Sequence, residues 1–154
     1  MIVELGHFAL VLALAVALVQ TVLPAWGAQT RDARLMRVAE PAAFCQLALV
    51  VMAFAALTYA YVTSDFSVEN VWANSHSDKP LLYKISGVWG NHEGSMLLWV
   101  LILALFGAAV AFYGTNLPDG LRANVLSVQA VIAAAFLGFI VIASNPFTRI
   151  PLQA

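Results

Sequence analysis

Charged side chains are scarce in this sequence. Only 10% of its 154 residues are Asp, Glu, Lys or Arg, while 62% are hydrophobic. Typical soluble domains contain about 25% charged residues. The formal net charge is −1, which gives no case for the basic surface that nucleic-acid binding requires. The composition therefore argues against both a soluble globular domain and a nucleic-acid-binding module.

Cysteine is almost absent as well. The single cysteine, Cys45, has no partner for a disulfide within the chain, and we expect it to be a small residue of the core. The sequence has no C-x-x-C pair, no H-E-x-x-H motif, no phosphate-binding glycine loop and no signature of a nucleophile triad. We therefore expect that this chain alone does not catalyse a reaction.

What the sequence does have is four long windows without any charged residue. These windows are residues 5–30, 41–64, 94–118 and 123–148. Each is longer than the roughly 20 apolar residues that cross a bilayer as a helix, and a helix satisfies its own backbone hydrogen bonds in lipid. The predicted fold is an all-α integral membrane protein formed by residues 1–154 as a single membrane segment. Its four transmembrane helices are expected near residues 5–26, 42–63, 95–113 and 123–144.

The basic residues predict how these helices are oriented. One side of the membrane receives Arg31, Arg34, Arg37 and Arg122, and the other receives Lys79, Lys84 and Arg149. The arginines of the first side lie in short loops, and positive residues in short loops favour the cytoplasm. Both ends of the chain and the loop 64–94 would then face outward, into the periplasm if the cell is bacterial.

Small residues recur at four-residue spacing within the windows, for example at Ala9, Ala13 and Ala17. Such spacing lets helix backbones approach closely in lipid and predicts a packed bundle. Gln20 and Gln129 are polar residues within the windows, and we expect their amides to join helices. A transporter would instead need ionisable groups or broken helices near the middle of the membrane.

The loop 64–94 changes character along its length. Its first half is polar and typical of turns, whereas the apolar residues 81, 82, 85, 88 and 89 share one helical face behind Pro80. This pattern predicts a short helix at the membrane interface. We expect Gly87 and Gly90 to end it, Asn91 to cap the third transmembrane helix, and Glu93 to lie in the first turn of that helix.

Aromatic and imidazole side chains gather at the same membrane surface, namely Trp72, His76, Trp89, His92 and Trp99. Such a set suits a flat, apolar, metal-bearing ligand such as heme, since aromatic faces stack on a porphyrin and an imidazole can bind iron. Tryptophans also form belts at the edges of many membrane proteins, and surface histidines are commonly solvated. Spacing alone leaves both interpretations open.

One long stretch resembles a known family. Residues 64–99, "SDFSVENVWANSHSDKPLLYKISGVWGNHEGSMLLW", closely resemble the N-terminal region of the CcmF family of cytochrome c biogenesis proteins. The family pattern is an N-S pair, then P-x-x-Y-K, then W-G-x-H-E-G-S-x-x-x-W. The stretches "ELGHFAL" and "ASNPFTR" also look like the first helix and the end of the fourth helix in that family.

The resemblance implies a function in the heme lyase step of cytochrome c maturation. The implied partners are a heme chaperone of the CcmE type, a thioreductive subunit of the CcmH type, apocytochrome c and the lipid bilayer. The implied location is the bacterial inner membrane, with multiple spans. Heme is the implied cofactor, and the residues expected to face heme or a partner are Trp72, His76, Trp89, Gly90, His92, Glu93 and Trp99.

The sequence also departs from the family. Members of the family are several times longer, and their WWD signature and heme-ligating histidines lie downstream of anything that matches here. We therefore expect an N-terminal portion of a longer protein, either truncated or naturally split, and assign no ligand role to His7, His76 or His92. The alternatives are a transporter subunit for heme or another small solute, and a non-catalytic scaffold of the maturation complex.

Overall fold

Four long helices dominate the computed structural model, which describes residues 1–151. They are α1 (Ile2–Thr30), α3 (Ala39–Val62), α6 (His92–Tyr113) and α7 (Asp119–Ala143). All four are long and apolar enough to cross a membrane, and no strand occurs within residues 1–151. The prediction of an all-α membrane protein with four transmembrane helices is confirmed, and each helix is slightly longer than its predicted range.

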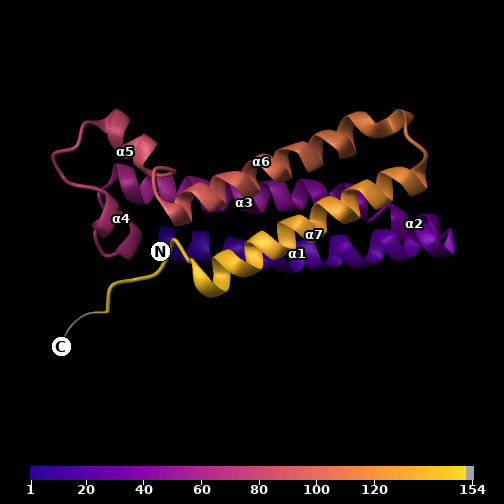
Figure 1. The fold of residues 1–154 in the computed structure, drawn as a ribbon, viewed down its shortest axis with the longest axis horizontal. Coiled ribbons are helices and arrows are strands. Elements are labelled where there is room, and N and C mark those ends of the chain that lie inside the picture. Colours follow the sequence, from indigo (N-terminus) through magenta and orange to yellow (C-terminus); the bar gives the residue numbers. More distant parts are fainter. Residues whose placement is uncertain (152–154) are drawn as a thin grey trace.

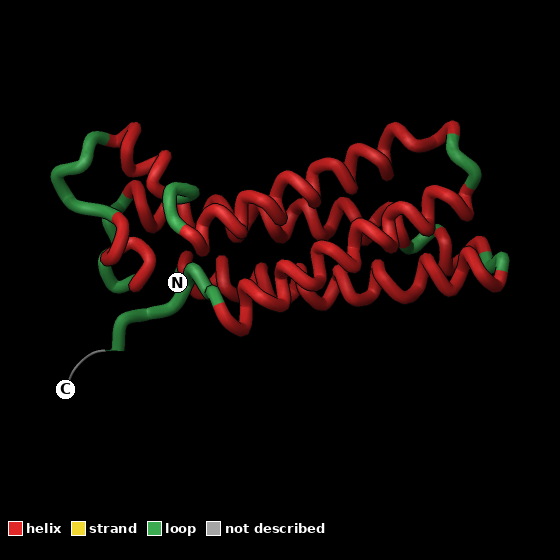
Figure 2. The backbone as a smooth tube through the Cα atoms, in the orientation of Figure 1, coloured by secondary structure: helices red, strands yellow, loops and turns green. Residues whose placement is uncertain are grey.

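The four helices form one bundle (Figure 1). α1 packs against α3 and α7, and α6 packs against the same two helices. The shorter elements cap the two ends of this bundle, where the loops also lie (Figure 2). We name them the α5 end, which carries α4 (Glu69–Asn74), α5 (Leu81–Gly87) and the N-terminus, and the α2 end, which carries α2 (Ala33–Met36) and the 3-10 turn η1 (Gly114–Asn116).

Close backbone approaches hold the bundle together. Ala9, Ala13 and Ala17 are completely buried, as their spacing predicts. At Gly6, an added Cβ would lie 2.8 Å from the Cβ of Ala56 and 2.5 Å from the ring of Phe147. Only the smallest residue fits there, so small side chains set the distance between α1 and α3.

One prediction about the core is wrong. Cys45 is exposed on the outer surface of α3, whereas the next residue, Gln46, is completely buried. In lipid the exterior is as apolar as the interior, so hydrophobicity does not decide which face of a helix turns inward. The buried face of α3 follows its small residues instead, including Ala39, Ala43 and Ala53.

Each end of the bundle contains a short helix that the sequence did not predict, namely α2 and α4. The first loop contains α2. Asp32 caps the start of this helix, because its side chain accepts a hydrogen bond from the backbone N–H of Arg34 (2.9 Å). The loop 64–94 contains α4 in its polar half as well as the predicted helix α5, which follows Pro80 and ends at Gly87. The predicted short helix after Pro80 is therefore present, and α4 is an additional element.

Ion pairs occur at both ends of the bundle. Arg122 of α7 pairs with Glu40 of α3 at the α2 end. At the α5 end, the Nε atom of Arg149 donates a hydrogen bond to Glu4 of α1 (3.0 Å). Between these ends the outer surface is apolar, with Phe106 and Ile142 among its exposed side chains. This distribution is that of a multi-pass membrane protein.

Candidate functional site

Three side chains from three elements form a closed hydrogen-bonded ring at the α5 end. The hydroxyl of Tyr61, which is completely buried at the end of α3, donates to Oδ1 of Asn70 (2.6 Å). Nδ2 of Asn70 donates to Oδ1 of Asn91 (3.0 Å), and Nδ2 of Asn91 donates to the Tyr61 hydroxyl (2.9 Å). The ring ties α3, α4 and the start of α6 to one another.

Asn91 also begins α6. Its Oδ1 atom accepts the backbone N–H of Gly94 (2.8 Å), as expected for a helix cap. Its Nδ2 atom donates to the carbonyl oxygen of Gly87 (2.9 Å). The chain turns so tightly that a Cβ added at Gly94 would lie 1.6 Å from the carbonyl oxygen of Val88. The predicted cap is confirmed, and the W-G-x-H-E-G stretch folds as a compact turn.

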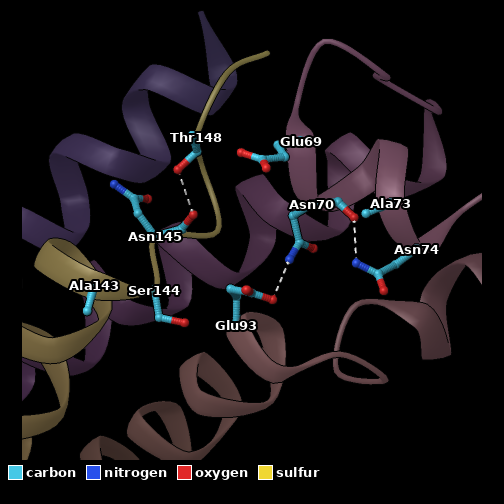
Figure 3. Close-up of a pocket in the computed structure, with 9 residues that line it drawn as sticks. All are labelled: Glu69, Asn70, Ala73, Asn74, Glu93, Ala143, Ser144, Asn145 and Thr148. Carbon is cyan, nitrogen blue, oxygen red and sulfur yellow. Dashed lines mark hydrogen bonds between the residues drawn. The ribbon is translucent and has the colours of Figure 1, made fainter. Parts of the chain in front are cut away.

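Glu93 points toward α4, where it contacts Asn70, which is not one of the predicted site residues. Its Oε2 atom accepts a hydrogen bond from Nδ2 of Asn70 (3.1 Å), as Figure 3 shows. It lies in the first turn of α6, where a carboxylate complements the helix dipole. The residue therefore has a structural role that involves both α4 and α6.

A polar pocket of about 290 Å³ lies beside this contact (Figure 3). Segments far apart in the sequence form its walls: α4, the start of α6 and the chain that follows α7. Its polar lining residues are Glu69, Asn70, Asn74, Glu93, Ser144, Asn145 and Thr148. Two carboxylates and no basic side chain line it, so the pocket favours groups that donate hydrogen bonds or carry positive charge.

His92 occupies a different hollow, between α6 and α7. Its Nδ1 atom lies 3.1 Å from the Ser144 hydroxyl, and its ring meets Phe139 edge-on, with centroids 6.4 Å apart. Met96 and Phe136 complete an apolar wall beside it. Since Ser144 engages Nδ1, the Nε2 atom of this exposed ring is the one that remains for a ligand.

The structure divides the remaining predicted residues between separate places. Trp99 lies on α6 two turns after His92 and is exposed. Trp89 and Gly90 are exposed in the turn between α5 and α6. Trp72, on α4, lines a hollow with Glu69, Ile150 and Pro151, and His76 is exposed in the segment after α4. Within residues 1–151, no three His, Cys, Asp or Glu side chains are placed to hold a metal ion.

Sequence reasoning missed several residues of this end. Tyr61 and Asn70 could not be singled out in the sequence, because their partners in the ring are up to 30 residues away. Asn145 also makes a distant contact, because its Nδ2 atom lies 2.9 Å from Nδ1 of His7. A signal did exist for this last pair, since both residues lie in stretches that resemble the family pattern, "ELGHFAL" and "ASNPFTR".

Known proteins with similar sequences test the resemblance to the CcmF family. The chain is 65% identical over 150 residues to the cytochrome c-type biogenesis protein ccl1 of Rhodobacter capsulatus, covering 97% of this chain and 23% of the relative. It is 50% identical over 150 residues to the cytochrome c-type biogenesis protein CcmF of Pseudomonas aeruginosa, again covering 97% of this chain and 23% of the relative. The resemblance to the N-terminal part of the CcmF family is confirmed. No family model matches the chain.

The fold agrees with a solved CcmF structure. The cytochrome c heme lyase CcmF aligns with a TM-score of 0.91 and 28% identity, covering 99% of this chain and 26% of that one. The chain thus spans about a quarter of the length of the CcmF proteins it matches. The alignment with the solved CcmF covers the four-helix bundle and its capped α5 end.

Proposed function

We propose that this chain is part of a cytochrome c heme lyase and that its α5 end faces the periplasm of a bacterial inner membrane. The observation that carries the proposal is the 65% identity to a cytochrome c-type biogenesis protein over nearly the whole chain. The distribution of arginines supports the orientation, because Arg31, Arg34 and Arg37 all lie at the α2 end.

In this proposal, heme is the substrate and reaches the α5 end on a chaperone of the CcmE type. A subunit of the CcmH type presents the apocytochrome c. The exposed aromatic side chains Trp89 and Trp99 and the apolar wall beside His92 offer surfaces against which a flat apolar molecule can pack. No residue of this chain is assigned as an axial heme ligand, because the heme-ligating histidines of the family that it resembles lie downstream of the part that matches here.

The predicted residues then have distinct roles. Trp89, Gly90, His92 and Trp99 form the edge that heme or its chaperone contacts, and Trp72 and His76 extend the surface over α4. Glu93 supports this edge from below, because its hydrogen bond with Asn70 fixes the start of α6 against α4. The polar pocket beside Glu93 suits a donor-rich or basic group of a protein partner better than it suits heme.

The test compares variants in an intact cytochrome c maturation system. We expect Trp89→Ala to lower the yield of holocytochrome c several-fold while the level of the protein in the membrane stays normal. Trp26→Ala is the matched control, because Trp26 is also an exposed tryptophan but lies on the last part of α1, toward the α2 end.

Glu93→Gln separates the charge of Glu93 from its structural role. A glutamine at this position still accepts a hydrogen bond from Asn70, so the fold should tolerate the change. A reduced yield would show that the charge serves a partner or substrate. If neither Trp89→Ala nor Glu93→Gln changes the yield, this end is a capped helix with an aromatic belt, and the chain acts as a scaffold.

A further inference from the structure

Gln46 places a polar amide in the interior of the four-helix bundle. The residue is completely buried, and both its Oε1 and its Nε2 atom lack a hydrogen-bond partner within residues 1–151. The Oε1 atom of Gln20 on α1, also completely buried, shares this condition. An unpaired amide in a membrane interior is costly, because neither lipid nor bulk water can satisfy it.

The neighbouring amides lie at the same depth. Nε2 of Gln20 donates to the carbonyl oxygen of Leu126 (3.0 Å) and to Oε1 of Gln129 (3.1 Å) on α7. Ala43, one turn before Gln46 on α3, packs in a small cluster with Leu126. Helix lengths place Gln20, Gln46 and Gln129 about 10–15 Å from the α2 end of their helices. The three amides therefore belong to one level of the bundle.

Small residues surround this level and leave the amides room. A Cβ added at Gly107 of α6 would lie 2.8 Å from the carboxamide carbon of Gln129. Nε2 of Gln129 donates to the carbonyl oxygen of Leu103 (3.1 Å), which joins α6 to the group. All four long helices thus contribute to this level, in which the side chains of Gln20 and Gln46 are completely buried and that of Gln129 is half-buried.

The missing partner of Gln46 has to come from inside the bundle. Its side chain has no exposed surface, so neither another helix nor a second protein can reach it without opening the packing. Both side-chain N–H groups of Gln20 are engaged. The Ser127 hydroxyl donates to the backbone carbonyl oxygen of Gln20 (3.2 Å), not to its side-chain Oε1. A water molecule can donate to the two amide oxygens and accept from the Gln46 N–H group.

We propose that Gln46 and Gln20 form an internal water site within the membrane-spanning bundle. The water bridges α3 to the amide pair of Gln20 and Gln129, so that hydration links all four helices. The site is uncharged, since Asp, Glu, Lys and Arg are absent from the surrounding windows. It therefore serves packing between helices rather than the movement of ions.

Water-edited solid-state NMR on the protein in lipid bilayers tests this site. We expect the side-chain NH₂ group of Gln46 to receive magnetisation from water although it lies deep in the bundle. Its cross-peak is identified by its loss in Gln46→Met. Gln29, which is exposed near the α2 end, is the positive control, and the buried methyl group of Ala13 is the negative control.

The result that overturns the proposal is equally specific. If the NH₂ group of Gln46 receives no magnetisation from water and instead shows a direct dipolar contact with the amide of Gln20 or Gln129, the amides pair with one another and the site holds no water. A second measurement uses stability. Gln46→Met removes the amide that the water bridges and leaves Oε1 of Gln20 without a donor, so we expect a lower midpoint of thermal unfolding. An unchanged or higher midpoint would contradict the proposal.

Discussion

The Nδ2 atom of Asn145 lies 2.9 Å from Nδ1 of His7, although 138 residues separate the two in the sequence. Residues near these two in the sequence are also in contact. The ring of Phe147 occupies the space beside Gly6, and Arg149 pairs with Glu4. The segment after α7 is thus fastened along the first turns of α1. The two stretches that resemble the CcmF pattern at opposite ends of the chain form one contact.

Replacing Asn145 tests this contact. In Asn145→Ala, His7 loses its partner, and the backbone N–H of Phe147 loses the side-chain oxygen that it binds at 3.0 Å. We expect the free energy of unfolding to fall by about 1–3 kcal/mol. Thermal unfolding in detergent provides the measurement. An unchanged midpoint would show that Phe147 and Arg149 hold the segment without Asn145.

The ring at the α5 end predicts a cost for removing one hydroxyl. Tyr61→Phe leaves Oδ1 of Asn70 without its 2.6 Å donor and removes a partner of Asn91. Because the site is buried, we expect the free energy of unfolding to fall by about 1–3 kcal/mol. Tyr59→Phe is the matched control, since Tyr59 is half exposed on the same helix and should change stability little.

Two glycines predict opposite tolerance to the same substitution. A Cβ at Gly94 would lie 1.6 Å from the carbonyl oxygen of Val88, whereas a Cβ at Gly138 would meet nothing within 4 Å. We expect Gly94→Ala to disrupt the start of α6 and to lower the amount of folded protein strongly. Gly138→Ala should accumulate normally, because alanine also favours a helix more than glycine does. Quantitative immunoblots of membranes compare the two, and equal levels would be evidence against the tight turn.

Topology is open to a direct test with reporters. A reporter that is active only outside the cytoplasm should be active when fused after Asp78 and silent when fused after Arg34. The reason is the concentration of arginines at the α2 end. The reverse pattern of activities would reject the proposed orientation and the delivery of heme to the α5 end.

Heme binding by this chain provides a further prediction. Purified residues 1–154 should show no stoichiometric heme with axial ligands, because His92 is a single imidazole beside an open apolar wall. Absorption spectra of the reduced and oxidised protein test this. A sharp bis-imidazole spectrum that disappears in His92→Ala would show that His92 is a heme ligand.

How much of this structure could be predicted depends on the kind of interaction. The windows without charge predict all four transmembrane helices, because charge is expelled from the bilayer regardless of what packs around it. The cap at Asn91 was also predictable, since capping is local in sequence. The rotation of each helix about its own axis, which decides the residues that face inward, could not be predicted. Cys45 and Gln46 are neighbours, yet the polar one faces inward.

The candidate site was predictable only in part. The motif located the right end of the bundle, but the division of its residues between the polar pocket and the wall beside His92 depends on α7 and the segment after it. Asn70 appears unremarkable in the sequence and becomes the centre of the ring through contacts with Tyr61 and Asn91. Such contacts between distant residues leave no periodic signal.

The ring of Tyr61, Asn70 and Asn91 has a thermodynamic consequence for whatever binds at the α5 end. The connection between α3 and α6 is long enough to fluctuate, yet its hydrogen bonds hold α4 against the bundle before any ligand arrives. Ordering a loop is one of the entropic costs of association, and here the loop is already ordered in the folded protein. A partner that docks there, as proposed above, then loses less binding free energy to the ordering of this loop.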